Sequence, residues 1–448
     1  MTTSRFLLTA TSALFAAGML AAPAFAQQVP AAPAAPAAPA AAETPTCWGM
    51  VTGIKCGLQI EGGVSFNPSA PKTNFGQLFT DHPNQATLNQ MALTIERDVA
   101  KDAAGWDYGF KFQGLYGSDA RYTHFLGVFD YALPQSRYQF DITEASVSVH
   151  APLLVGLDVK AGLYPTPLGF EYIDPSLNPF YSHSYIFNFG IPLKHSGVLA
   201  TLHATDFLDV YGGVDTGENT TFGDQAGDNN GTIAGLAGFG FTALGGNLTG
   251  IALTHFGPEN PSYGTTQPYG YGNANQYFRY ENDANVTYKW NDKLSTTLEL
   301  NYIKDTNPYL YTTNGPVNAP EAWGVAGYLA YSLTDTVTLN ARAEVFRDGK
   351  GFYVNYFPGN TDFVNAQYGK YNTSVAGPHS TYGALTVGAT WKPSGLPKLI
   401  SGLMVRPEIR FDQTLGGPNA FNGNIVNGRY VGTDAGSVTF ASDFILQF

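Results

Sequence analysis

Charged and apolar side chains alternate in the segment LMVRPEIRFDQ, which spans residues 403–413. In an extended strand successive side chains point to opposite faces, so the apolar residues share one face and the charged residues share the other. The charged face is formed by Arg406, Glu408, Arg410 and Asp412. A row of side chains of both signs sets up a local electric field, and this pattern therefore favours the attraction and orientation of ions or polar solutes.

The same alternation recurs in other segments, for example in TVTLNARAEVF, residues 336–346. Its apolar residues again occupy one face, and its charged residues occupy the other. If the segments belong to one closed sheet, these charges share the interior of that sheet. The further charged residues that we place there are Lys111, Lys160, Arg342 and Glu344.

The elements that would position these charges are alternating strands bounded by Gly, Pro, Asn or Asp. Sixteen are predicted, at 56–66, 87–98, 106–116, 139–150, 157–164, 194–204, 207–216, 232–242, 247–256, 278–290, 293–305, 322–333, 336–347, 381–391, 402–413 and 435–448. One misjudged hairpin would change the number to fourteen or eighteen. The last strand contains ASDFILQF, in which Phe440, Phe444 and Phe448 share an apolar face while Asp443 points the other way.

The connections between these strands alternate in length, which is more informative than any one strand. Short links occur at 205–206, 244–246, 291–292 and 334–335. Long links occur at 117–138, 165–193, 217–231, 257–277, 306–321, 348–380 and 414–434. A soluble sandwich gives no reason for this alternation, whereas a transmembrane antiparallel β-barrel combines short periplasmic turns with long outer loops. The fold class that we predict is all-β, a transmembrane barrel of about sixteen strands.

The composition agrees with strands that are apolar on one face only. The chain has 14% aromatic residues, 51 glycines and only 13% charged residues, and its formal net charge of -12 disfavours nucleic acid as a partner. No stretch after the N-terminal region has the roughly 18 consecutive apolar residues that a membrane helix needs.

The N-terminal region is predicted to be separate from the barrel. Residues 1–26 have the charged, apolar and small-residue order of a secretory signal peptide, and a membrane helix is the weaker alternative because the apolar run is short. Residues 27–55 form an Ala- and Pro-rich periplasmic tether, and residues 56–448 form the barrel. Cys47 and Cys56 are predicted to form a disulfide, with two free thiols as the alternative.

Several strings in the first half of the barrel resemble a known family. They are WDYGFKFQGLYGSDARYT (106–123), AGLYPTPLGFEY (161–172), NPFYSHSY (178–185) and KHSGVLATLHATD (194–206). With these strings the chain is similar to the OmpL-like β-barrel porins of Gram-negative bacteria. The resemblance implies a barrel in the outer membrane with porin activity, but it implies no substrate and no binding residues. The Ala- and Pro-rich tract and the cysteine pair are not features of that family.

A barrel of sixteen strands is wide enough to leave an aqueous channel. The aromatic and Pro-rich connection 165–193 is the best candidate for a constriction loop within it. We expect Glu171 and Asp174, with His183 nearby, to face the wall of Arg342, Arg406 and Arg410 and to orient polar solutes in a transverse field. In the alternative arrangement the loop packs outside or at the rim, and the arginines pair with the acids of their own strands. His183 and His195 flank the constriction and are interpreted as hydrogen-bonded structural residues.

The function predicted from these features is passive diffusion of small hydrophilic solutes or ions through an outer-membrane porin. The expected partners are outer-membrane lipid and the solute, and a homo-oligomer such as a trimer is left open. No cofactor, metal or catalytic residue is expected. A barrel enzyme such as a hydrolase is the first alternative, although the sequence has neither a Gly-x-Ser-x-Gly nor a His-Glu-x-x-His motif. A plugged structural or adhesive barrel is the second.

Overall fold

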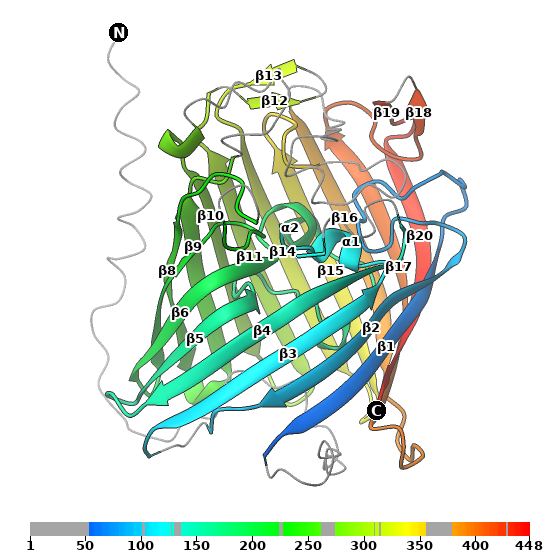
Figure 1. Cartoon of the computed structure of the whole chain (residues 1–448). Helices are drawn as coiled ribbons and strands as arrows, with labels where there is room; N and C mark the ends of the chain where they lie inside the picture. The colour runs from blue at the N-terminus through cyan, green and yellow to red at the C-terminus, as the bar shows by residue number, and fades with distance from the viewer. Residues whose placement is uncertain are drawn as a thin grey trace.

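The computed structural model describes residues 53–448, except for 101–103, 127, 130–135, 224–226, 261–273, 309, 313–314, 355–378 and 427–428. In this part of the chain, sixteen long antiparallel strands close into one barrel (Figure 1). They are β1 (Lys55–Phe66), β2 (Ala86–Arg97), β3 (Asp107–Gly117), β4 (Gln139–Ala151), β5 (Gly156–Pro165), β6 (Lys194–Thr205), β7 (Leu208–Asp215), β8 (Ala234–Ala243), β9 (Leu248–Gly257), β10 (Arg279–Lys289), β11 (Leu294–Asp305), β14 (Glu321–Ser332), β15 (Val337–Asp348), β16 (Ser380–Trp391), β17 (Gly402–Gly416) and β20 (Gly436–Gln447).

Each strand pairs with the next one in the chain, and β20 pairs with β1 to close the sheet. Closure leaves no strand edge unpaired, as a sheet in contact with lipid requires. The predicted fold class is confirmed, and so is the number of sixteen strands. Most strand ends lie within one or two residues of the predicted positions.

The remaining elements are short and belong to the connections. The two outer hairpins lie at the end of the barrel opposite the C-terminus (Figure 1). No helix in the described residues is long and apolar enough to cross a membrane. The short elements are α1 (Ala120–Thr123), η2 (Pro175–Leu177), α2 (Tyr185–Phe189), η3 (Leu244–Gly246), η4 (Ala274–Gln276), the hairpin β12 (Leu310–Thr312) and β13 (Gly315–Val317), and the hairpin β18 (Asn424–Val426) and β19 (Arg429–Val431).

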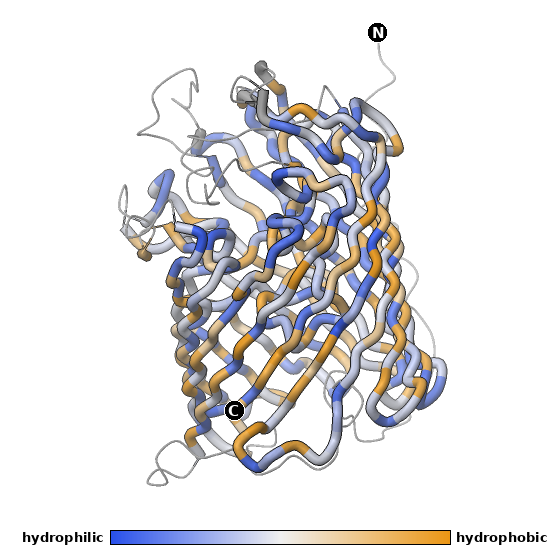
Figure 2. Tube along the Cα trace, turned by 90° about the vertical axis from the view of Figure 1, so that its right-hand side faces the viewer, coloured by the Kyte–Doolittle hydropathy of each residue, from blue (hydrophilic) through white to orange (hydrophobic). Residues whose placement is uncertain are grey.

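Alternation of side chains gives the wall two different faces. Along β14, Trp323, Val325 and Leu329 are exposed on the outside, whereas Ala322 and Ala326 are fully buried on the inside. Figure 2 shows the result as hydrophobic and hydrophilic segments that alternate along the wall. The apolar outer face is the one that lipid can cover without leaving polar groups unsatisfied.

The closing strand β20 has the orientation that its sequence predicts. Phe440 and Phe444 are exposed on the outer face, and Asp443 is buried on the inner face. Asp443 lies opposite Arg406 of β17 in the strand register and opposite Gly63 of β1. The backbone ladder therefore holds the seam between the first and last strands, and the inward charge pair joins the last strand to β17.

Replacing Leu300 of β11 by Arg tests the lipid-facing assignment. Leu300 lies near the middle of its strand and is exposed, so we expect Leu300→Arg to lower the free energy of unfolding in lipid vesicles by about 2–4 kcal/mol. The control is Leu333→Arg, because Leu333 is equally apolar and exposed but follows the end of β14. That change should cost only about 0–1 kcal/mol. Equal costs in denaturant titrations would contradict the assignment.

Candidate functional site

The connection 165–193 between β5 and β6, here called the lumen loop, lies inside the barrel. The Nε2 of Gln90 on β2 donates to the carbonyl of Ile173 at 2.8 Å, and the amide of Tyr181 donates to Glu408 on β17 at 2.9 Å. The amide of Gly169 donates to Asp283 on β10 at 3.2 Å. These strands stand at distant positions around the barrel, so one loop can reach all of them only by crossing the interior. Figure 1 shows α2, which belongs to this loop, within the outline of the barrel.

Three arginines of the wall hold the carbonyl groups of the lumen loop. Nη1 of Arg342 donates to the carbonyl of Ser182 at 2.9 Å, and Nη1 of Arg410 donates to that of His183 at 2.6 Å. Nη1 of Arg406 donates to the carbonyls of Pro175 and Asn178, at 2.7 and 2.9 Å. All three arginines are buried. Irregular backbone cannot satisfy its own carbonyls, and a guanidinium with five donors can satisfy several at once.

The acidic residues of the same wall receive the amides of the loop. Glu408 accepts the N–H groups of Tyr181 and Ser182, and Glu344 accepts the N–H of Tyr185 at 2.7 Å. The Tyr185 amide lies at the start of α2, where no intrahelical acceptor exists. The mixed signs of the ladder therefore match the mixed donors and acceptors of an irregular backbone.

Glu171 is the charged centre of the lumen loop. Its Oε1 lies 2.6 Å from Nη1 of Arg342, and its Oε2 accepts the amide of Ser184 and lies 2.9 Å from Nδ1 of His183. Burial by itself raises the pKa of Glu171, but Arg342, His183 and the Ser184 amide outweigh burial and lower the pKa to about 2. Glu171 is therefore a carboxylate at neutral pH.

The other two predicted residues of the loop have structural partners. Asp174 accepts the amide of Ser176 at the start of η2 and the side-chain amide of Gln59 on β1, both at 2.9 Å. The ring of His183 stacks on Phe187 of α2 with 4.0 Å between the ring centroids. Both contacts fix the shape of the loop.

Glu171 and Asp174 lie against the arginine wall, and the orientation of solutes by a transverse field stays a prediction. Glu171 is in direct contact with Arg342. Asp174 lies next to a carbonyl that Arg406 holds, because Arg406 binds Pro175. The alternative pairing within a strand is also present, since Arg410 forms an ion pair with Asp412 at 2.8 Å. These charged side chains of the wall therefore hold the loop in place.

The eight predicted wall residues fall into two groups. Six of them contact the lumen loop or an adjacent wall charge and are no more than 5% exposed. The side chains of Lys111 and Lys160, by contrast, are 36% and 39% exposed. Lys160 forms an ion pair with Glu144 at 2.9 Å, and Lys111 lies 3.6 Å from Glu96. The buried group is Arg342, Glu344, Arg406, Glu408, Arg410 and Asp412.

A second inward segment, 67–85 between β1 and β2, was missed by the sequence reasoning. Phe79 packs against His183 and Phe187 of the lumen loop, with ring centroids 4.8 and 5.5 Å apart. Asp81 accepts both terminal nitrogens of Arg121 at 2.9 and 2.8 Å, which ties this segment to α1. Burial raises the pKa of Asp81, but Arg121 and His82 outweigh it and hold the pKa well below its usual range. The aromatic residues of 67–85 were the available signal.

The cysteine prediction concerns the start of the barrel. Cys56 is the second residue of β1, and it is not a free thiol. Its predicted partner Cys47 lies outside the described residues, as do the predicted signal peptide 1–26 and most of the tether 27–55. The Cys47–Cys56 pairing therefore stays a prediction.

A closed sixteen-stranded barrel with an apolar exterior and a loop folded into its polar interior defines an outer-membrane channel protein, a porin. The comparison with protein families agrees, since residues 53–448 match the family described as "Putative beta-barrel porin-2, OmpL-like". The chain belongs to this family, and its place is the outer membrane of a Gram-negative bacterium. The resemblance inferred from the sequence is confirmed.

Solved structures with a similar fold are also porins or outer-membrane channels. The anion-selective porin from Comamonas acidovorans is 10% identical, with a TM-score of 0.53 over 88% of this chain and 99% of that one. The outer-membrane channel DcaP of Acinetobacter baumannii is 11% identical, with a TM-score of 0.50 over 88% and 97%. A trimer form of OmpT of Vibrio cholerae is 12% identical, with a TM-score of 0.50 over 88% and 99%. Among curated proteins, none matches this chain. At these identities the likeness shows the fold.

Replacing Glu171 by Gln tests its role as the anchor of the lumen loop. The change leaves the buried Arg342 with Glu344, at 3.4 Å, as its remaining carboxylate partner. Removing one partner of a buried ion pair costs up to about 3–5 kcal/mol, so we expect larger fluctuations of the single-channel current at neutral pH. In the wild type the pKa of Glu171 is depressed from 4.5 to about 2. Its contribution is therefore complete above about pH 4.5 and is lost as the pH falls towards 2. The fluctuations of the wild-type single-channel current should increase only in that acid range.

The matched control for this experiment is Glu321→Gln, which removes a carboxylate that is 48% exposed and lies 3.7 Å from Lys304. Its current should stay as steady as that of the wild type at neutral pH. Identical recordings from Glu171→Gln and the wild type between pH 7 and pH 3 would show that Glu171 does not hold the loop.

Proposed function

We propose that the lumen loop constricts this porin and that solutes diffuse through a passage between the loop and the wall formed by β3, β4 and β5. The observation that carries the proposal is the difference in exposure between the two groups of wall charges. Six are buried against the loop or its anchors, while Lys111 and Lys160 keep more than a third of their side-chain surface exposed. Lysines that reach water from the inner face of β3 and β5 favour an aqueous path beside them.

The distribution of hydrogen bonds around the loop supports a passage on the same side of the barrel. Apart from the base of the loop, where Thr166 meets His195 of β6, hydrogen bonds run between the loop and side chains of eight strands, namely β1, β2, β10, β11, β14, β15, β16 and β17. These strands form one continuous arc of the barrel wall, because β20 lies between β17 and β1. The loop is therefore drawn towards that arc, and the space that remains lies on the opposite side of the barrel, which includes β3, β4 and β5.

The charges along this passage suggest weak selectivity in the wild type. Lys111 is the strand partner of Glu96, and Lys160 forms an ion pair with Glu144. Each of the two lysines is thus paired with an acidic side chain of a neighbouring strand, and neither ion sign is strongly favoured. Small hydrophilic solutes and ions of both signs are the proposed cargo.

Catalysis is not part of the proposed function. Family and fold are those of channel proteins, which supports a non-enzymatic role over the hydrolase alternative. A plugged structural barrel would also have this fold, so conductance decides between it and a porin. The absence of any ohmic step from a well-folded barrel in a planar bilayer would contradict our proposal.

The proposal also covers the N-terminal segments that precede the barrel, and the lipid and protein partners of the chain. Residues 1–26 act as the signal peptide and 27–55 as a periplasmic tether, which N-terminal sequencing of the exported chain tests. Outer-membrane lipid covers the apolar exterior. The fold likeness to a trimer form of OmpT supports a homotrimer, and a native mass of one chain in mild detergent would contradict it.

Replacing residues 168–191 by a short Gly- and Ser-rich link removes the proposed constriction. The arginines that held the loop would then be solvated by lumen water, and we expect a clear increase in single-channel conductance because a wider path has a lower resistance. A matched control shortens the long outer connection 417–435, between β17 and β20, by the same approach, and it should leave the conductance near that of the wild type. An unchanged conductance after removal of 168–191 would contradict the constriction.

Replacing both Lys111 and Lys160 by Gln tests the position of the passage. The change leaves Glu96 and Glu144 without their partners, so we expect a several-fold shift of the permeability ratio towards cations. Reversal potentials in a salt gradient measure it. Lys304→Gln is the control, because Lys304 lies on the outer side of β11 next to Glu321. An equal effect of control and double variant would place the passage elsewhere.

A further inference from the structure

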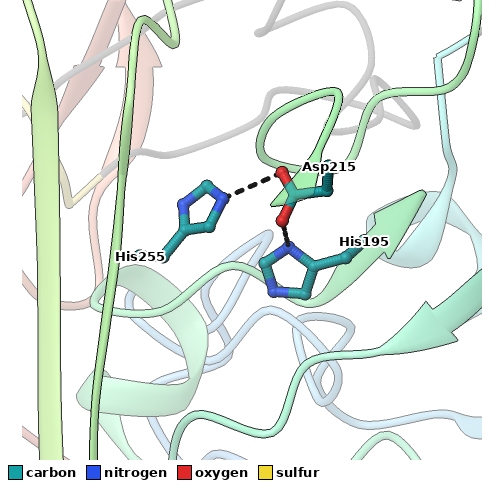
Figure 3. A group of neighbouring side chains, drawn as sticks. All are labelled: His195, Asp215 and His255. Carbon is teal, nitrogen blue, oxygen red and sulfur yellow. Dashed lines mark hydrogen bonds and ion pairs between the residues drawn. The ribbon is translucent and has the colours of Figure 1, made fainter. Parts of the chain in front are cut away.

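Two histidines and an aspartate meet inside the barrel at the outer ends of three different strands. His195 belongs to β6, Asp215 to β7 and His255 to β9, and none is more than 3% exposed. Nδ1 of His195 lies 3.1 Å from Oδ2 of Asp215, and Nε2 of His255 lies 3.0 Å from Oδ1. Figure 3 shows the carboxylate between the two imidazole rings, with one oxygen towards each. One donor atom from each residue lies within 4.8 Å of the other two.

The outer nitrogen of each imidazole ring has a separate partner. Nε2 of His195 lies 2.9 Å from the hydroxyl of Thr166, and Nδ1 of His255 lies 3.1 Å from Oε2 of Glu281 on β10. If these outer nitrogens carry the ring protons, the two nitrogens that face Asp215 present lone pairs. A metal-binding histidine typically donates its other N–H to a carboxylate or another oxygen in this way. With the ring protons on these outer nitrogens, both rings would be in the tautomer that binds a metal.

The cluster also contains buried polar atoms that no directional hydrogen bond satisfies. They include Nδ1 of His195 and Oδ2 of Asp215, although these two atoms are only 3.1 Å apart. Oε1 of Glu281 and Oε1 of Glu259 are also buried without a directional hydrogen bond. Oε1 of Glu259 lies 3.8 Å from Nδ1 of His255. Buried polar atoms are rarely left without a partner, and water or an ion can supply one.

The charges around the cluster do not balance. Asp215, Glu259 and Glu281 bring three acidic groups, and the ion partners that the structure describes for them are histidines alone. The nearby Arg279 forms ion pairs with two other acids, Glu218 at 2.5 Å and Asp305 at 3.3 Å. A divalent cation supplies the missing positive charge, and two imidazoles with a carboxylate suit a transition metal better than calcium or magnesium.

From these observations we infer that His195, Asp215 and His255 form a binding site for one divalent transition-metal ion such as zinc. Three protein ligands leave a fourth position for water or for a neighbouring carboxylate, Glu259 or Glu281. Donor atoms around tetrahedral zinc lie about 3.3 Å apart. The widest donor separation in the cluster, 4.8 Å, would therefore have to shrink by about 1.5 Å to reach coordination distance. Thr166 and His195 stand at the two ends of the lumen loop, and the ion would tie its base to β7 and β9.

Zinc binding to the untagged mature protein in detergent tests the inference. The protein is first stripped with a chelator and is then titrated with zinc, both after folding and during refolding, because the site is buried. We expect one tightly held zinc per chain by calorimetry and elemental analysis. Cobalt in place of zinc should give the visible absorption of a tetrahedral nitrogen and oxygen site.

Variants of the cluster separate metal binding from a purely structural role. Asp215→Asn and His255→Gln should each weaken zinc binding by more than about tenfold, and Thr166→Val, which removes only the partner of His195, by about tenfold. The matched control is His203→Gln. His203 belongs to another His–Asp–His group, with Asp158 and His150, but is about a third exposed, and it should bind zinc like the wild type. Heat-dependent migration on gels confirms that each variant is a folded barrel.

Three results would overturn the inference. One is a wild type that takes up no zinc under either condition. Another is a folded Asp215→Asn variant, together with a folded His255→Gln variant, that binds zinc as tightly as the wild type. The third is the loss of zinc in His203→Gln, because the ion would then be held by the other cluster. Binding that appears only during refolding supports the site, since the buried residues would close around the ion as the loop docks.

Discussion

The structure depends on one constraint, the need to satisfy the backbone of an irregular loop inside a barrel. Strands satisfy their own amides and carbonyls through the ladder, but the lumen loop has only short helical turns of its own. Arginines and acids of the wall supply the missing partners. Arg406 alone holds two loop carbonyls, and Glu408 holds two loop amides. Charged residues that could have lined water are instead the fixed points of the loop.

Burying these charges is costly unless each has partners of the opposite sign as well as hydrogen bonds. Arg406 has both, since it also forms ion pairs with Glu61 of β1 and Asp443 of β20. Because these acids lie on the two strands that close the barrel, the same guanidinium joins the seam to the loop. Barrel closure and loop docking are thereby coupled, and a change at this arginine would affect both.

The regular part of the structure was predictable from the sequence, because a strand depends on its own alternation. The faces of β14, β17 and β20 follow directly from the period of two, and the alternating connection lengths gave the barrel. The loop contacts were not predictable in this way. Glu171 and Arg342 are separated by 171 positions in the chain, and the sequence alone could not tell contact from opposition across a gap.

The interpretation of His195 shows the same limit. As a single residue it gave no more than a hydrogen-bonded structural histidine, because its neighbours in the cluster come from β7 and β9. Only the strand order sets Asp215 between His195 and His255, since β7 pairs with β6 on one side and with β8 on the other. The period of two assigns side chains to one face of each strand, but the barrel register decides which side chains of different strands meet.

The two polar regions of the lumen differ in how their charge is balanced. Around Arg342 and Arg410, guanidinium groups and carboxylates neutralise each other within the protein. Around Asp215, acids outnumber the arginines, and histidines stand where those cations would be. An imidazole carries a positive charge only when it binds a second proton, and when it is neutral its lone pair can bind a metal ion that brings the positive charge. The charges of the first region are therefore balanced by protein groups alone, whereas the second region depends on a cation from the surrounding water. This second region lies where the lumen loop begins and ends.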